Sequence, residues 1–144
     1  MSITPDALLH RWFEELWNQG KEETIDALMA PGTKIHGLPT PDGGPISGPE
    51  AFKPFFRTFR GALPDLHVAI ERTVTQGDMV VAHCHVTGTH GGPHLGVAPT
   101  GKGVDFWGMT MARARDGKLV EGWNCFDFLS LYQQIGLLPG LAGA

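Results

Sequence analysis

The sequence predicts an α+β fold in which N-terminal helices cover one face of a curved antiparallel sheet. Apolar residues recur at helical spacing until about residue 61 and alternate with polar residues from residue 66 onward. The turn sequences Gln76-Gly77-Asp78 and Asp116-Gly117 join the later segments into hairpins. The aromatic lining of the helices predicts that helices and sheet together enclose an apolar pocket, the usual form of a small-molecule site.

Composition and charge indicate a single globular domain over residues 1–144. Apolar residues make up 42% of the chain and charged residues 18%, which suits a packed core rather than disorder. A net charge of −4 gives no electrostatic reason to expect nucleic acid or an anionic membrane as partner. The polar start, Met1 to Asp6, lacks a signal pattern, and no run of about 18 apolar residues occurs. We therefore expect a cytoplasmic protein.

Helix signals mark the first part of the chain. Thr4-Pro5-Asp6 is typical of a helix start, and Asn18-Gln19-Gly20 of a helix end. A short helix is expected from about Glu22 to Met29 and a short strand from Thr33 to Leu38. After a loop over Pro39–Pro49, a third helix carries an apolar stripe that we interpret as core: Phe52, Phe55, Phe56 and Phe59.

The second part of the chain is predicted to be β structure. Four long strands are expected, joined by short turns and one loop rich in Gly and Pro: Leu66–Gln76, Met79–His90, Lys102–Arg115 and Lys118–Phe128. A last helix is expected from about Phe128 to Gly136.

The final strand contains one amide in an otherwise apolar row. Because side chains alternate between the faces of a strand, one face is expected to carry Val120, Gly122, Asn124, Phe126 and Phe128. The other face is expected to carry Leu119, Glu121, Trp123, Cys125 and Asp127. Asn124 is then either a hydrogen-bonded core residue or a group directed at a ligand, and the sequence leaves both open.

The penultimate strand is unusually apolar on its predicted outer face. That face would carry Asp105, Trp107, Met109, Met111 and Arg113. Because large exposed apolar patches usually mark a partner, we expect a homodimer through this outer sheet face. His83 and His85 could share a strand face, but no carboxylate follows at the spacing of a metal site, so no metal is predicted.

Six sequence motifs in order resemble the SnoaL-like polyketide cyclases, also called predicted ester cyclases, of the NTF2-like superfamily. The motifs are Trp17-Asn18-Gln19-Gly20, Leu63-Pro64-Asp65-Leu66, Gly88-Thr89-His90, Leu95–Lys102, Asp116-Gly117-Lys118 and Glu121-x-Trp123-x-x-x-Asp127. The resemblance implies a cone-shaped α+β barrel with a deep pocket. It also implies an intramolecular aldol condensation without metal or organic cofactor, and dimers or tetramers.

The family's functional positions carry different residues in this chain. The catalytic aspartate falls on Asn124, its assisting histidine on Thr110, and a pocket glutamine on Gly108. A further histidine falls on Gly122, and an asparagine of the early strand falls at or near His36.

An aldol ring closure needs a base and a hydrogen-bond donor for the enolate. Asn124 can donate but cannot titrate, so proton transfer is assigned first to His36 and then to His90, which shares strand parity with the predicted cavity face. The prediction is a cofactor-independent enzyme acting on an apolar, carbonyl-bearing substrate. Its expected pocket lining is Trp12, Phe13, Trp17, Phe56, Phe106, Gly108, Thr110, Gly122 and Phe126.

Two other functions stay open. One is a non-catalytic small-molecule-binding protein that keeps the pocket and has lost the acid/base pair. The other is an interaction module that uses the apolar outer sheet face and has a filled cavity.

Overall fold

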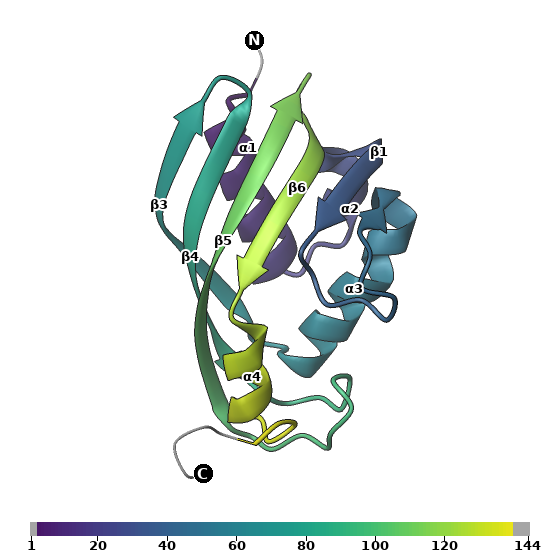
Figure 1. Ribbon diagram of the computed structural model, residues 1–144, viewed down its shortest axis with the longest axis vertical. Coiled ribbons are helices and arrows are strands. Elements are labelled where there is room, and N and C mark those ends of the chain that lie inside the picture. Colours follow the sequence, from purple (N-terminus) through teal and green to yellow (C-terminus); the bar gives the residue numbers. More distant parts are fainter. Residues whose placement is uncertain (1–2, 140–144) are drawn as a thin grey trace.

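A six-stranded curved sheet with helices against one face forms the architecture of the computed structural model, which describes residues 3–139 (Figure 1). The strands are β1 (Met29–His36), β2 (Ile46–Ser47), β3 (His67–Gln76), β4 (Met79–Thr89), β5 (Gly103–Arg115) and β6 (Lys118–Phe126). The helices are α1 (Pro5–Arg11), the π-helical segment η1 (Trp12–Asn18), α2 (Glu23–Leu28), α3 (Gly48–Ala62) and α4 (Phe128–Gln134). This arrangement confirms the predicted α+β class.

The first helix begins as predicted and then widens into a π-helix. The Thr4 hydroxyl oxygen accepts a hydrogen bond from the Ala7 amide at 3.1 Å, and Pro5 occupies the first turn. From Trp12 the helix continues as η1, whose four buried side chains are Trp12, Phe13, Leu16 and Trp17. Both segments pack against β3, and α1 also packs against β4 and β5. Among residues 3–139, every helix is too short or too polar to cross a membrane.

Asn18 fastens the end of η1 to the edge of the sheet. Its Nδ2 donates to the Val68 carbonyl at 3.0 Å, and its Oδ1 accepts from the Val68 amide at 2.6 Å. The side chain thus occupies the backbone groups that an additional strand would use on β3. This explains the physical role of the asparagine in the Trp17–Gly20 motif.

The sheet order is β2-β1-β6-β5-β4-β3, and the two outermost strands do not meet. The three pairings from β3 to β6 are antiparallel, as expected. The expected sheet was antiparallel throughout, but β1 pairs with β6 in parallel, so the sheet is mixed. Part of the predicted loop is also strand, because Ile46 and Ser47 pair with Ile35 and Lys34.

A β-bulge changes the predicted faces at the start of β6. The pairing register shifts so that Arg113 lies opposite Glu121 but Ala114 lies opposite Leu119, which leaves Val120 as the extra residue. Strict alternation placed Leu119 on the outer face, and that prediction is wrong. Leu119 is 3% exposed and belongs to the core, whereas Val120 is only half-buried.

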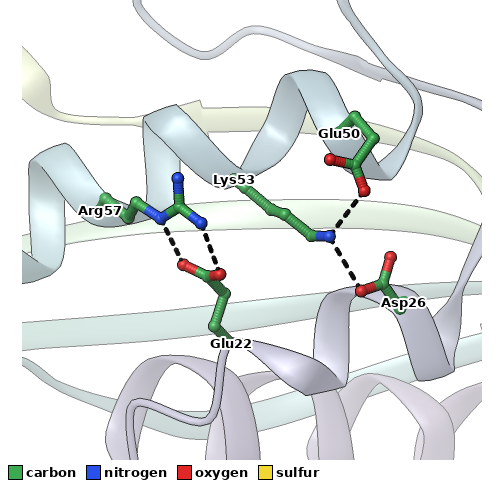
Figure 2. Close-up of polar contacts among 5 residues, drawn as sticks. All are labelled: Glu22, Asp26, Glu50, Lys53 and Arg57. Atoms are coloured by element: carbon green, nitrogen blue, oxygen red, sulfur yellow. Dashed lines mark hydrogen bonds and ion pairs between the residues drawn. The ribbon is translucent and has the colours of Figure 1, made fainter.

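An ion-pair network holds α2 beside α3 (Figure 2). Arg57 donates from Nε and Nη2 to the two carboxylate oxygens of Glu22, at 2.6 and 2.7 Å. Lys53 Nζ lies 2.9 Å from Asp26 Oδ2 and 2.6 Å from Glu50 Oε1. The network sits on the solvent side of these helices, and the stripe of α3 centred on the buried Phe52, Phe56 and Phe59 faces inward.

The pH dependence of the Glu22–Arg57 pair has a definite sign. The hydrogen bonds from Arg57 hold the pKa of Glu22 below its usual value, so the pair stabilises the fold above the unfolded-state pKa and this contribution is lost as pH falls through the folded-state pKa. We therefore expect Glu22→Gln to lower the melting temperature slightly near neutral pH. Near pH 2 the substitution should have no effect, because the Glu22 carboxyl is then protonated in both the folded and the unfolded protein. Thermal unfolding at the two pH values measures this.

Glu23→Gln is the matched control, because within the described part of the chain Glu23 forms no ion pair. An equal loss of melting temperature at both pH values in Glu22→Gln would show that the side chain acts through packing rather than charge.

Candidate functional site

An apolar cavity lies between the helices and the concave face of the sheet. Its volume is about 90 Å³. Seventeen of its twenty lining residues are apolar and nine are aromatic: Trp12, Phe13, Trp17, Phe52, Phe55, Phe59, Phe106, Phe126 and Phe128. Such a wall favours an apolar, ring-containing ligand.

The opening of the cavity can be located from the exposure of its walls. Most lining side chains are buried, but six are half-buried: Leu38, Phe55, Glu121, Asn124, Phe126 and Phe128. Glu121 lies near the start of β6, and the other five come from the loop after β1, from α3, and from the junction of β6 with α4, which Figure 1 shows around the lower ends of β1 and β6. The mouth therefore lies at this junction, with Asn124 beside it.

Asn124 presents a hydrogen-bond donor to this cavity. Its Nδ2 donates to the His36 backbone carbonyl at 3.2 Å, and its Oδ1 accepts from the Thr110 hydroxyl at 2.7 Å. A carbonyl oxygen can only accept, so the nitrogen end of the amide must face His36. An amide nitrogen carries two hydrogens, and the contact with the His36 carbonyl uses one of them.

Gly37 allows the close approach that positions Asn124. Its φ is +85°, in the left-handed region, and a Cβ built there would lie 1.9 Å from the Asn124 backbone oxygen. The turn at the end of β1 thus contacts the backbone of β6 at Asn124. No larger residue fits between the two segments without moving Asn124.

His36 lies on the other side of the sheet from the cavity. Its Nε2 is 2.7 Å from Glu121 Oε2, and its ring stacks on Trp123 with centroids 5.8 Å apart. We expected the imidazole beside the cavity, and the structure places only the backbone carbonyl there. The physical reason is the parallel register, which pairs His36 with Trp123 and turns the neighbouring Ile35 inward against Gly122.

Glu121 is the one titratable residue among the described residues that line the cavity. Its carboxylate is half-exposed and bound to His36. Sequence reasoning did not select it, because strand alternation assigned Glu121 to the outer face together with Trp123. Its contact with His36, whose ring lies on the outer side of the sheet, agrees with that assignment, so Glu121 borders the cavity while its carboxylate is held on the outer side.

His90 is a buried anchor at the end of β4 and does not line the cavity. It is 0% exposed, its Nδ1 accepts from the Thr100 amide at 3.2 Å, and the Thr100 hydroxyl lies 3.0 Å from the same atom. Backbone hydrogen bonds from His90 to Lys102 and from Gly101 to His90 close the same loop. We expected His90 at the cavity mouth, and the structure instead buries it beside the loop that ends at Lys102.

Six residues of the predicted lining face the cavity, namely Trp12, Phe13, Trp17, Phe106, Thr110 and Phe126, and three do not. Phe56 packs on Trp17 with ring centroids 5.2 Å apart. Gly108 is covered by the Phe126 ring, and Gly122 by the Ile35 side chain. Phe52, Phe55 and Phe59, which the periodicity of α3 indicated as core, contribute a wall of the cavity.

The outer sheet face carries a second set of large apolar side chains. Trp107, Met109 and Met111 of β5 are 42%, 51% and 37% exposed. His85 stacks on Trp107 with centroids 4.2 Å apart, and its Nε2 lies 2.6 Å from Asp105. Within residues 3–139, no three His, Cys, Asp or Glu side chains gather as a metal site.

Neither cysteine forms a disulfide bond. Cys84 is buried, and burial raises the pKa of its thiol to about 12, so the thiol stays protonated at neutral pH. Cys125 is exposed.

Gly37→Ala should destabilise the protein by more than about 3 kcal/mol, because positive-φ strain and overlap with the Asn124 backbone add together. Chemical denaturation measures the loss. Gly43→Ala is the matched control: Gly43 has a φ of +72°, but a Cβ built there would have no atom within 4 Å. It should cost only about 1 kcal/mol. Equal losses would contradict the role assigned to the contact with Asn124.

A family model identifies the family of this chain. The sequence model of the SnoaL-like polyketide cyclase family matches residues 7–135. A search of curated proteins finds no match.

Three solved structures illustrate the similarity. A protein described as a SnoaL-like polyketide cyclase from Jannaschia Sp. CCS1 has 28% identity and a TM-score of 0.80, with 94% of this chain and 93% of that chain covered. IdmH, described as a polyketide cyclase from Streptomyces antibioticus, has 30% identity and a TM-score of 0.79, with coverages of 93% and 99%.

A ketosteroid isomerase-like protein from Catenulispora acidiphila, solved with trimethylamine, has 17% identity and a TM-score of 0.72, with coverages of 93% and 95%. Its similarity concerns the fold alone. The family match extends from α1 to the end of α4, and it includes the whole cavity and its mouth. The chain belongs to the SnoaL-like polyketide cyclase family, with the NTF2-like fold.

Proposed function

We propose that this protein binds a small apolar molecule that carries a carbonyl group, and that the carbonyl oxygen accepts a hydrogen bond from Asn124 Nδ2. The observation that carries the proposal is the fixed amide: Thr110 and the His36 carbonyl occupy its oxygen and one of its hydrogens. The remaining N–H is available at the mouth of an otherwise apolar cavity. Beside apolar walls, a hydrogen bond to a ligand acceptor is stronger than the same bond in bulk water.

Binding without ring closure is the function that this geometry supports best. The cyclase reaction implied by the family needs a group that takes and returns a proton. The two positions to which the family's acid/base pair falls carry Asn124 and Thr110, and neither side chain titrates near neutral pH. With Asn124 and Thr110 at these positions, the site can still form hydrogen bonds but cannot transfer a proton through them.

A second candidate is a cofactor-independent acid/base enzyme, and the position of Glu121 favours it. The Glu121 carboxylate would have to turn from His36, 2.7 Å away, into the cavity that the residue borders. It would then take a proton from the carbon next to the ligand carbonyl, the electron pair would move to the carbonyl oxygen, and Asn124 would stabilise the resulting enolate. His36 would hold the carboxylate between turnovers. In this proposal His36 acts through Glu121, and His90, which lies away from the cavity, takes no part.

The carbonyl preference can be tested with indanone and with indane, which has the same ring system without the oxygen. Trp12 and Trp17 line the cavity, so quenching of their fluorescence should report binding. We expect indanone to bind about tenfold more tightly than indane, because one net hydrogen bond contributes about 1.4 kcal/mol. Asn124→Ala should remove the difference and leave indane binding intact. An unchanged preference in Asn124→Ala would rule out the donor role.

The two candidate functions differ in hydrogen exchange. If Glu121 acts as a base, the protein should accelerate deuterium uptake at the carbon next to the indanone carbonyl, as followed by NMR in D₂O, and Glu121→Gln should abolish the acceleration. Exchange no faster than in buffer, with indanone bound, would leave the binding protein as the function. Asp105→Asn, which alters a carboxylate on the outer face, is the control that should leave the exchange rate unchanged.

We further propose that the outer sheet face joins two copies of this chain in a homodimer. Trp107, Met109 and Met111 form an exposed apolar row across a face without covering helices, and monomers rarely leave such patches open. The family resemblance implies dimers or tetramers. The curved sheet would then separate the cavity from the interface.

Met109→Lys should convert the dimer to a monomer, because it would place a charge in a desolvated apolar interface. Light scattering after size-exclusion chromatography at micromolar concentration measures the mass. Val74→Lys on the edge strand β3, where Val74 is 68% exposed, should keep the dimer. A wild-type protein of monomeric mass would contradict this interface.

A further inference from the structure

We propose that Phe126 is the specificity-determining residue of the cavity and that its ring limits the ligand to a compact ring system. This inference rests on the proposed binding function and names the size class of its ligand. It is carried by the unusual position of the Phe126 side chain over Gly108, at the half-exposed end of the cavity.

The Phe126 ring occupies space that a side chain at position 108 would fill. The two residues lie directly opposite each other on β5 and β6. A Cβ built on Gly108 would lie 2.3 Å from both Cγ and Cδ2 of Phe126, and 2.7 Å from its Cα. The ring therefore lies beside the bare backbone of β5 at Gly108 and lines the cavity.

This ring lies two residue pairs along the strands from the hydrogen-bond donor. The Met109–Cys125 pair separates Thr110–Asn124 from Gly108–Phe126, so these four residues share the inward face. Two residues along a strand span about 7 Å. A ligand whose carbonyl is bound at Asn124 would therefore meet the Phe126 ring within about the length of one or two fused rings.

Other rings hold Phe126 in this position. Phe106 contacts it nearly edge-on, with centroids 6.5 Å apart, and Phe128 lies 6.2 Å away. Both are lining residues, so Phe126 and its neighbours narrow the cavity at its half-exposed end. Because Phe126 is half-buried, its removal would extend the cavity toward solvent rather than create a closed void.

A purely structural role makes a different prediction. If the ring only covers Gly108 and stabilises the strand pair, shortening it would lower stability and weaken all ligands equally. If the ring limits size, shortening it should change the ratio of affinities for large and small ligands. The affinity ratio therefore separates the two roles, whatever happens to the melting temperature.

The experiment measures dissociation constants for indanone and for fluorenone, which adds one fused ring, by tryptophan fluorescence. Wild-type protein should bind indanone at least tenfold more tightly than fluorenone. Phe126→Ala should reduce or reverse this ratio by at least tenfold, and Phe126→Leu should give an intermediate value. Leu129→Ala, which removes a side chain that is 52% exposed and outside the cavity, should keep the wild-type ratio.

Each outcome decides between the proposals. An unchanged ratio in Phe126→Ala, with indanone still preferred over indane, would overturn the size limit and leave carbonyl binding in place. A changed ratio without any preference of indanone over indane would support the size limit and overturn the role of Asn124. Binding of fluorenone by Phe126→Ala alone would also support the size limit. Failure of wild type and both variants to bind any of these compounds would overturn both proposals.

Discussion

The parallel pairing of β1 with β6 is the constraint on which the site depends. It brings the His36 carbonyl to Asn124, so the amide nitrogen has a fixed acceptor. It also turns Ile35 inward over Gly122 and the His36 imidazole outward onto Glu121 and Trp123. The close approach at Gly37 makes this pairing possible, because no side chain separates the two segments there. The register between β1 and β6 thus decides that the Ile35 side chain turns inward and that only the backbone carbonyl of His36 reaches Asn124.

The chemical character of the cavity follows from how its polar groups are paired. A buried amide is costly unless it is hydrogen-bonded, and Asn124 meets this condition through Thr110 and His36 with one N–H left over. Aromatic walls supply apolar contact without a charge of their own. The site is therefore suited to orient an acceptor group, and any proton transfer has to come from the border, where Glu121 lies.

The inner face of the sheet is proposed to bind the ligand, and the outer face is proposed to form the dimer interface. The inner face carries Gly108, Thr110 and the aromatic wall, and the outer face carries Trp107, Met109 and Met111 on alternate positions of the same strand. On the solvent side of the helices, the ion pairs of Glu22 with Arg57 and of Asp26 and Glu50 with Lys53 hold α2 and α3 together. Strand alternation thus lets one element serve both a pocket and an interface.

Local sequence signals determined the helix start at Thr4, the hairpin turns, the long strands and the α+β class, because each depends on residues only a few positions apart. They also indicated Asn124 as the exceptional residue of β6. Only the tertiary structure decided the parallel pairing of β1, the bulge at Val120, the burial of Leu119 and the outward direction of His36. The pairing of β1 and the direction of His36 depend on contacts between segments more than 80 residues apart in the chain. The bulge is a register shift between β5 and β6, and no local pattern encodes which residue of one strand pairs with which residue of the other.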